Sequence, residues 1–237
     1  MTFDFSSKEK ALETVKRDGL FLEHAPYSYR NNYDVVKEAV QDTAFAFEYA
    51  SEELRGNKDI ATLAVSSFGK MLKYASDDIK DDKYIVMCAV KNDGTSLEFA
   101  SDKLKDDREI TLAAMNIASG EMADEAYSFI SDRLKNDNEF LLEAIKGNGF
   151  VIIHIPENRI NKDMALQAVM STGFAIGGLP EKYRNDIDVI LKAVEYNGNV
   201  IEYVPFDYMK DARVIGTALA RNPECVEIIN RRLQENQ

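Results

Sequence analysis

The sequence predicts an all-α protein, a single right-handed α-solenoid of about nine 25-residue helical repeats that spans residues 1–237. Hydrophobic residues make up 45% of the chain, which is enough for a folded core. An alanine inside an apolar quartet recurs every 25 residues or nearly so, with one step of 30: Ala39, Ala64, Ala89, Ala114, Ala144, Ala168, Ala193 and Ala218. One such copy cannot bury its apolar face alone, whereas stacked copies share a core. The handedness is expected by analogy with other solenoids.

Each copy opens with a capped α-helix. The opening position holds Asn or Asp in Asn32, Asn57, Asp82, Asp107, Asp137, Asn161, Asp186 and Asp211. A side-chain oxygen there can accept hydrogen bonds from free backbone N–H groups, and an acid two residues later complements the positive helix end. The apolar residues that follow, such as Val35, Val36, Ala39 and Val40, are spaced to form one buried stripe. An amphipathic helix is therefore expected after each opening position.

A glycine and a shorter helix follow the first helix. The glycine position, twelve residues after the opening position, holds Gly19, Gly69, Gly94, Gly149, Gly173 and Gly198. Because glycine adopts the left-handed conformation without steric cost, we expect it to close the first helix. The next segment, for example 95–100, is long enough for a short α or 3₁₀ helix. Each copy then ends in a capped turn with one apolar residue, as in 101–105 and 180–184.

The fifth copy is longer than the others. Its extra residues lie within 116–128, which separates sub-stretches 1–115 and 129–237 of the one expected domain. Insertions in solenoids usually form loops on one face, often the binding face. A lengthened helix is the alternative. At the two ends of the chain, we expect Phe3 and Phe5 to cover the first copy and residues 230–235 to form a polar closing cap.

Residues 81–107, DDKYIVMCAVKNDGTSLEFASDKLKDD, resemble the helical repeat of the family called domain of unknown function 4116. The resemblance extends over nearly the whole chain through Ala-Val, Gly, an aromatic followed by Ala-Ser, and Leu-Lys-Asp-Asp at fixed offsets. More distantly, the chain is similar to the leucine-rich-repeat variant, in which α and 3₁₀ helices alternate. Neither resemblance implies a set of catalytic residues.

The residues that could carry catalysis are dispersed. His24 and His154 both occupy the place where other copies have an aromatic residue, here called the aromatic position: Tyr49, Tyr74, Phe99, Phe129 and Tyr203. In a solenoid, copies this far apart in sequence are far apart in space, so the histidines cannot share a metal or a triad. The same reasoning separates Cys88 from Cys225. We expect no catalytic residue, no cofactor and no metal site, because the sequence has no phosphate loop, zinc spacing or nucleophile elbow.

One departure from the repeat concerns Gly177 and Gly178, since Gly178 takes the aromatic position. The missing ring leaves either a packing gap or a shallow pocket, and we expect Phe174 or Tyr183 to compensate for it.

Charge restricts the class of partner. The chain holds 29 Lys and Arg against 41 Asp and Glu, a net charge of −12, which disfavours nucleic acid. No run of eighteen apolar residues exists, so no membrane partner is expected. The chain starts without a secretory signal, and two cysteines form no disulfide framework, so we expect a cytoplasmic protein.

Exposed acids are candidates for partner binding. Asp77, Asp78, Asp102 and Asp132 should stack along one edge of the solenoid. They form either an electronegative strip that attracts a basic partner or a set of solvated helix starts. Exposed apolar residues that mark a contact site are expected to include Met122 or Tyr127.

Together these patterns predict a non-catalytic scaffold that binds a protein or peptide on an extended face. A ligand-binding protein or enzyme with a pocket near the insertion or Gly177 and Gly178 is the first alternative. A structural or assembly module is the second.

Overall fold

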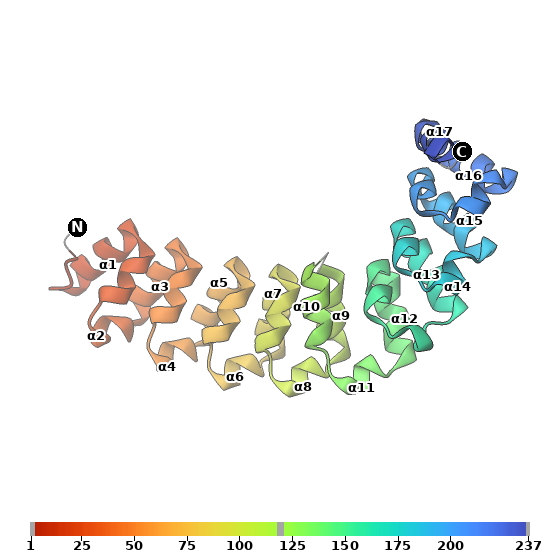
Figure 1. The fold of residues 1–237 in the computed structure, drawn as a ribbon. Coiled ribbons are helices and arrows are strands. Elements are labelled where there is room, and N and C mark those ends of the chain that lie inside the picture. The colour runs from red at the N-terminus through yellow and green to blue at the C-terminus, as the bar shows by residue number, and fades with distance from the viewer. Residues whose placement is uncertain (1–2, 118–120, 236–237) are drawn as a thin grey trace. The chain divides into compact units, whose positions relative to one another are not determined.

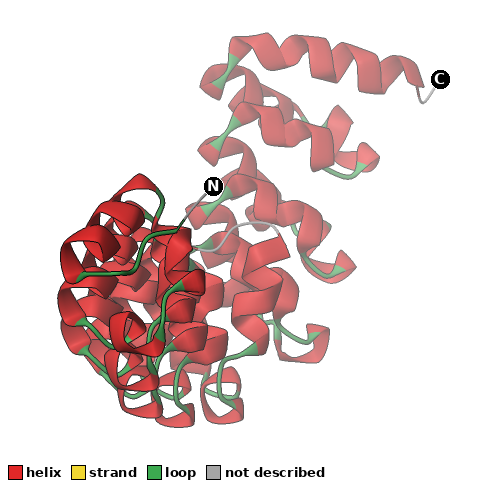
Figure 2. Cartoon of the chain, turned by 90° about the vertical axis from the view of Figure 1, so that its left-hand side faces the viewer, coloured by secondary structure: helices red, strands yellow, loops and turns green. Residues whose placement is uncertain are grey.

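The computed structural model describes residues 3–117 and 121–235, and within these ranges every regular element is a helix (Figure 1). Figure 2 shows only helices and loops in the described chain. The chain divides into two compact units, unit 1 at residues 1–134 and unit 2 at residues 135–237. The all-α class with repeated helical segments is thus confirmed.

Unit 1 repeats a long α-helix, a 3₁₀ helix and a short turn helix. The long helices are α1 Lys8–Arg17, α3 Tyr33–Asp42, α5 Lys58–Ser67, α7 Lys83–Asn92 and α9 Arg108–Ile117. The 3₁₀ helices are η1 Gly19–His24, η2 Ala44–Tyr49, η3 Gly69–Tyr74 and η4 Gly94–Phe99. The short helices are α2 Tyr27–Arg30, α4 Glu52–Arg55, α6 Asp77–Lys80, α8 Asp102–Lys105 and α11 Asp132–Lys135, the last of which reaches the boundary of unit 2. An eight-residue helix, α10 Glu121–Ser128, precedes α11.

Unit 2 has the same order with more 3₁₀ structure. Its long helices are α12 Asn138–Gly147, α13 Lys162–Ser171, α15 Ile187–Tyr196, α16 Ala212–Arg221 and the terminal α17 Val226–Glu235. Its 3₁₀ helices are η5 Gly149–His154, η6 Glu157–Arg159, η7 Gly173–Gly178, η8 Gly198–Tyr203, η9 Phe206–Lys210 and η10 Pro223–Cys225, and its short helix is α14 Glu181–Arg184. Pro156, Pro180 and Pro205 start the turn segments where most of unit 1 has Ser.

The opening positions cap the long helices as predicted. The Asp82 carboxylate accepts from the backbone N–H groups of Tyr84 at 3.0 Å and Ile85 at 3.2 Å. The Asn57 amide oxygen accepts in the same way at 3.1 and 3.2 Å. These bonds satisfy N–H groups that have no partner inside the helix.

The core is formed by the apolar stripe of the long helices and by buried residues from most of the shorter elements and turns. Val35, Val36, Ala39 and Val40 of α3 are all buried, as are the equivalent quartets of α5, α7, α9, α12, α13 and α15. The 3₁₀ helices contribute Phe47, Leu72, Leu97, Ile152, Ile176 and Ile201, and the turn segments contribute Leu54, Ile79, Leu104, Leu134, Ile160, Tyr183 and Met209. A buried side chain of this size stabilises the fold by roughly 1.5–3 kcal/mol.

The glycines do not close the long helices in the left-handed conformation, so that prediction is wrong. Wherever the structure describes the residue after a long helix, as at Phe68 with φ −146°, that residue is extended, and none of the glycines described at the glycine position has a positive φ. Instead, the glycines lie close to the repeated alanine of the next copy. An added Cβ would be less than 3.0 Å from the carbonyl oxygen of that alanine at Gly19, Gly69, Gly149, Gly173 and Gly198. Glycine is needed because two copies approach each other there.

Hydrogen bonds reinforce the same approach between copies. The Gly69 N–H donates to Asn92 Oδ1 and the Gly19 N–H to Asp42 Oδ2, both at 2.7 Å. Copy two has Ala44 at the glycine position, and its helix α3 packs against α5 less extensively than α5 packs against α7. The extra methyl group thus coincides with a looser junction.

The insertion forms a helix over residues 121–128, so of the two alternatives for the insertion the structure favours a lengthened helix over a loop there. Helix α9 keeps the ordinary ten residues, and α10 takes the place of a 3₁₀ helix and packs against η4. The added residues lengthen the second helix of the copy, not the first. Residues 118–120 lie outside the described structure.

Both ends of the chain agree with their predictions. The Phe3 ring packs on Phe21 at 4.9 Å and on His24 at 4.3 Å between ring centroids, and Phe5 faces Tyr29 at 6.1 Å. At the other end, residues 230–235 complete α17, and most of them are exposed. Within this polar cap, the Arg232 guanidinium donates to the carbonyl oxygens of Ile201 at 2.6 Å and Val204 at 2.7 Å.

Candidate functional site

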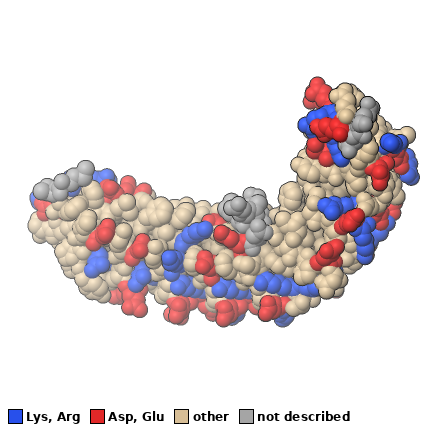
Figure 3. All heavy atoms as spheres, in the orientation of Figure 1, with Lys and Arg blue, Asp and Glu red and all other residues tan. Residues whose placement is uncertain are grey.

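The predicted acidic residues lie in the first turns of short helices. Asp77 and Asp78 begin α6, Asp102 begins α8 and Asp132 begins α11, and all four are exposed. Acidic and basic groups alternate along the lower edge of unit 1 in Figure 3, where Figure 1 places α4, α6 and α8. Asp77, Asp78 and Asp102 form no ion pair with any described residue, so their charge is open to solvent.

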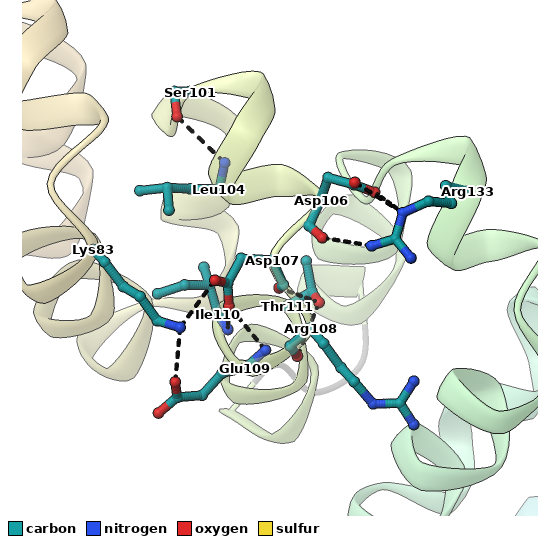
Figure 4. A network of polar contacts seen from close by, with 10 residues as sticks. All are labelled: Lys83, Ser101, Leu104, Asp106, Asp107, Arg108, Glu109, Ile110, Thr111 and Arg133. Carbon is teal, nitrogen blue, oxygen red and sulfur yellow. Dashed lines mark hydrogen bonds and ion pairs between the residues drawn. The ribbon is translucent and has the colours of Figure 1, made fainter.

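The neighbouring acids are used inside the fold. Figure 4 shows Asp106 and Asp107 side by side in the chain with different partners. The Arg133 guanidinium binds Asp106 at 2.8 Å and, with Ser131, lowers the pKa of that carboxyl. Burial acts to raise the pKa of Asp107, but Lys83 at 2.9 Å and the backbone N–H groups of Glu109 and Ile110 hold it below its usual value.

The same arrangement recurs between other copies. Lys58 reaches Asp82 at 2.6 Å, and Lys162 reaches Asp186 at 2.8 Å. Lys103 pairs with Asp81 at 3.0 Å, and Ser101 donates to the same carboxylate. These acids therefore join consecutive copies, and their carboxylates are already paired within the protein.

The excess of acidic residues lies mostly in unit 1. By sequence, unit 1 has 17 Lys and Arg against 26 Asp and Glu, whereas unit 2 has 12 Lys and Arg against 15 Asp and Glu.

The predicted apolar contact at the insertion is not established by the structure. Tyr127 is half-buried within α10, and the side chain of Met122 lies outside the described residues. Large apolar side chains are exposed at other places, with exposed fractions of 69% for Tyr84, 55% for Met170 and 51% for Tyr203.

A groove runs over the exposed faces of α13, α15 and α16 in unit 2. It consists of two adjoining hollows of about 600 and 200 Å³ that share Lys192 and Glu195. Its apolar side chains are Leu166, Met170, Leu191 and Tyr196, and Asp188 and Thr217 complete the lining. Lys192 and Glu195 bind each other at 2.7 Å at its centre.

Sequence reasoning missed this groove although a signal was present. Leu142, Leu166 and Leu191 occupy the place two residues before the repeated alanine, outside the buried quartet. In unit 1 that place holds Leu12, Lys37, Thr62, Met87 and Leu112, so an apolar residue there is not confined to unit 2. The signal in unit 2 is the run of leucine over three consecutive copies.

A second hollow lies at Gly178, where sequence reasoning allowed either a gap or a pocket. This Gly178 cleft, of about 500 Å³, is lined by the apolar residues Ile152, Ile153, Ile155, Ile160, Leu179 and Pro180 and by the charged residues Glu157, Glu181 and Arg184. The expected compensation by Phe174 or Tyr183 is wrong. Phe174 packs edge-on against Tyr203 with 5.8 Å between centroids, and the Tyr183 hydroxyl donates to the Ile160 carbonyl oxygen at 2.9 Å.

The residues considered for catalysis are used for packing or belong to different units. His24 stacks on Phe3 in unit 1, and His154 lies half-buried in unit 2. Both cysteines are free, and burial raises the pKa of the Cys225 thiol, which disfavours the nucleophilic thiolate. Across residues 3–117 and 121–235, no group of three or more His, Cys, Asp or Glu is placed to hold a metal ion. No helix in the described chain is long and apolar enough to cross a bilayer.

Comparison with known proteins adds the family. Searches of curated proteins and of solved structures found no match. The sequence model of the family described as domain of unknown function (DUF4116) matches five overlapping segments, residues 7–55, 57–101, 82–119, 122–158 and 161–210. These matches cover most of the chain and pause at the insertion, so the chain belongs to the DUF4116 family of helical repeats.

Proposed function

We propose that the protein is a non-catalytic scaffold that binds a segment of another protein or a peptide. The groove over α13, α15 and α16 carries this proposal. Four apolar side chains line it, and two of them, Met170 and Tyr196, are exposed by 55% and 44%. A row of apolar side chains on the outer face of consecutive helices gains free energy when a partner covers it.

The scaffold proposal includes finer features of the fold. We take the repeated segments to be about nine copies of one right-handed solenoid, whose neighbouring helices form an extended binding face. The net charge of −12 favours a basic partner over nucleic acid or a membrane. We also propose a cytoplasmic location, with which the two free thiols are compatible.

Selection of random displayed peptides on the purified protein tests the groove. We expect enriched peptides with two or more large apolar residues, whose dissociation constants rise at least tenfold when Met170→Asp and Leu191→Asp are combined. Tyr84→Asp in unit 1 is the matched control, since it also adds an acid at an exposed apolar residue. Failure to enrich any peptide, or equal binding to the groove variant and the control, would refute the proposal.

A ligand-binding protein or enzyme that uses the Gly178 cleft is the second candidate. The volume of the cleft and its three charged side chains favour it. Thermal-shift screening against common metabolites tests it, and stabilisation that disappears in Arg184→Ala would support it. An assembly module is the third candidate, and a concentration-dependent oligomer in light scattering would support that reading.

A further inference from the structure

The aromatic position normally closes the junction between two copies. The Tyr74 ring belongs to η3, and Glu48 of the preceding copy raises the pKa of its hydroxyl. Burial and the carboxylate of Glu23 do the same for Tyr49. In unit 2, the Tyr203 ring lies 3.4 Å from the place that a Cβ on Gly177 would take. Each of these three rings therefore interacts with the residue that precedes the aromatic position of the copy before it.

The junction between η5 and η7 lacks this closing ring. Gly178 holds the aromatic position, and the residue before His154 is Ile153 where copies one, two and four have Glu23, Glu48 and Glu98. The Cγ2 methyl of Ile153 leans into the space next to Gly178, yet the side chain stays 48% exposed. Two changes thus coincide at one junction: a ring is missing, and an apolar side chain replaces the acid that would face it.

The cleft also holds charged side chains without partners. Glu157 in η6, Glu181 in α14 and Arg184 in α14 all line it. None of the three makes a hydrogen bond or ion pair through its side chain with a described residue. Two carboxylates against one guanidinium leave a net negative charge beside the exposed side chain of Ile153, and such a site favours a ligand with an apolar group next to a cation.

We propose that the Gly178 cleft binds a short segment of another polypeptide in which an aromatic side chain is adjacent to Lys or Arg. The aromatic ring packs against the exposed part of Ile153 and against Pro180, because Ile153 Cγ2, 2.2 Å from the place of a Cβ on Gly178, fills the space where a ring at position 178 would begin. The basic side chain pairs with Glu157 or Glu181, and the Arg184 guanidinium donates to a carbonyl oxygen of the segment. A ring of this size buries about 150–250 Å² and supplies most of the contact area. This inference rests on the proposed function because the ligand is a polypeptide.

Methyl NMR of the full chain tests the cleft directly. The probes are the blocked dipeptides acetyl-Trp-Lys-amide, acetyl-Trp-Glu-amide and acetyl-Ala-Lys-amide, titrated into protein labelled at the isoleucine δ1 methyl groups. We expect acetyl-Trp-Lys-amide to shift the signals of Ile153, Ile155 and Ile160 and to bind at least tenfold more tightly than the other two. The chain has no tryptophan, so the indole fluorescence of the probe gives an independent dissociation constant.

Two variants make the outcome specific. Ile153→Glu combined with Gly178→Tyr installs the residue types of the other junctions, and binding should fall at least tenfold. Glu157→Gln combined with Glu181→Gln should abolish the preference for Lys over Glu in the probe while the tryptophan still binds. Tyr84→Asp serves as the control and should bind like wild type.

Three results would overturn the inference: no shift at Ile153, equal binding of acetyl-Ala-Lys-amide, or undiminished binding to the first double variant. This inference alone would be refuted if displayed peptides bind the groove over α13, α15 and α16 but none of the three dipeptides binds the Gly178 cleft. Loss of both activities would refute the scaffold proposal as well.

Discussion

Replacing Gly69 by Ala should destabilise unit 1, although alanine is the better residue for most helical positions. A Cβ on Gly69 would lie 2.5 Å from the Ala89 carbonyl oxygen and 2.6 Å from Ser96 Oγ, closer than unbonded atoms approach. Overpacking of this kind costs about 1–3 kcal/mol. Alanine restricts the unfolded chain and returns about 0.4–1 kcal/mol, because the φ of Gly69 is not positive. The central values of these two ranges, about 2 and about 0.7 kcal/mol, leave an expected net loss of about 1.3 kcal/mol.

Urea unfolding followed by circular dichroism at 222 nm measures this loss. With a slope of about 1–3 kcal/mol per molar urea, the midpoint should fall by roughly 1 M. Gly216→Ala is the control, because Gly216 lies inside α16 and an added Cβ there meets no atom within 4 Å. That variant should gain about 0.5–1 kcal/mol. If Gly69→Ala were as stable as wild type, close approach of the copies could not be the reason for glycine.

Three further predictions follow from individual contacts. Gly56→Asn should stabilise unit 1 by about 1 kcal/mol, because Ser76 Oγ is buried beside Gly56 without a hydrogen-bond partner, whereas Ser51 Oγ donates to Asn31 at the equivalent junction. Urea unfolding measures this gain, and the same gain in Gly56→Ala would contradict the explanation. Asp107→Asn should keep the helix cap but lose the ion pair with Lys83, which lowers the free energy of unfolding by less than about 1 kcal/mol. This loss should be present above pH 4 and disappear as the pH falls through the lowered pKa of Asp107, so a loss that does not change with pH would exclude the ion pair as its cause. Phe3→Ala should lower the free energy of unfolding by about 1–2 kcal/mol and speed amide hydrogen exchange in α1 and η1, while exchange in α7 stays unchanged. An equal increase of exchange in α1 and α7 would show that Phe3 does more than cover the first copy.

Much of the fold could be predicted from the sequence because its determinants are local. An opening Asn or Asp followed by an apolar stripe defines a helix start within one copy, and the structure shows the expected hydrogen bonds at Asn57 and Asp82. The glycine position was located correctly but explained wrongly. The reason for Gly69 is a carbonyl group twenty residues further along the chain, and its distance depends on how two copies pack.

The candidate sites were predictable only in part. Gly178 stands out in sequence because it departs from the repeat, but the position of Ile153 beside it depends on three-dimensional packing. The groove on α13 and α15 results from single apolar residues such as Leu166 and Leu191. In the sequence, these residues could equally have belonged to the buried stripe of their helices. The acids Asp77 and Asp102 were placed correctly at the surface, while the use of Asp106 by Arg133 required the neighbouring copy.

The contact at the glycine position has a consequence for how such a chain can change in length. The close approach itself joins a missing side chain in one copy to a main-chain oxygen in the next, as at Gly19 with Ala39 and Gly149 with Ala168. Side-chain hydrogen bonds such as that from the Gly69 N–H to Asn92 add to it, but the main-chain part is the same at each of these junctions. Whole copies can therefore be duplicated or removed by unequal recombination with this contact restored at the new boundary, provided that the break respects the 25-residue phase.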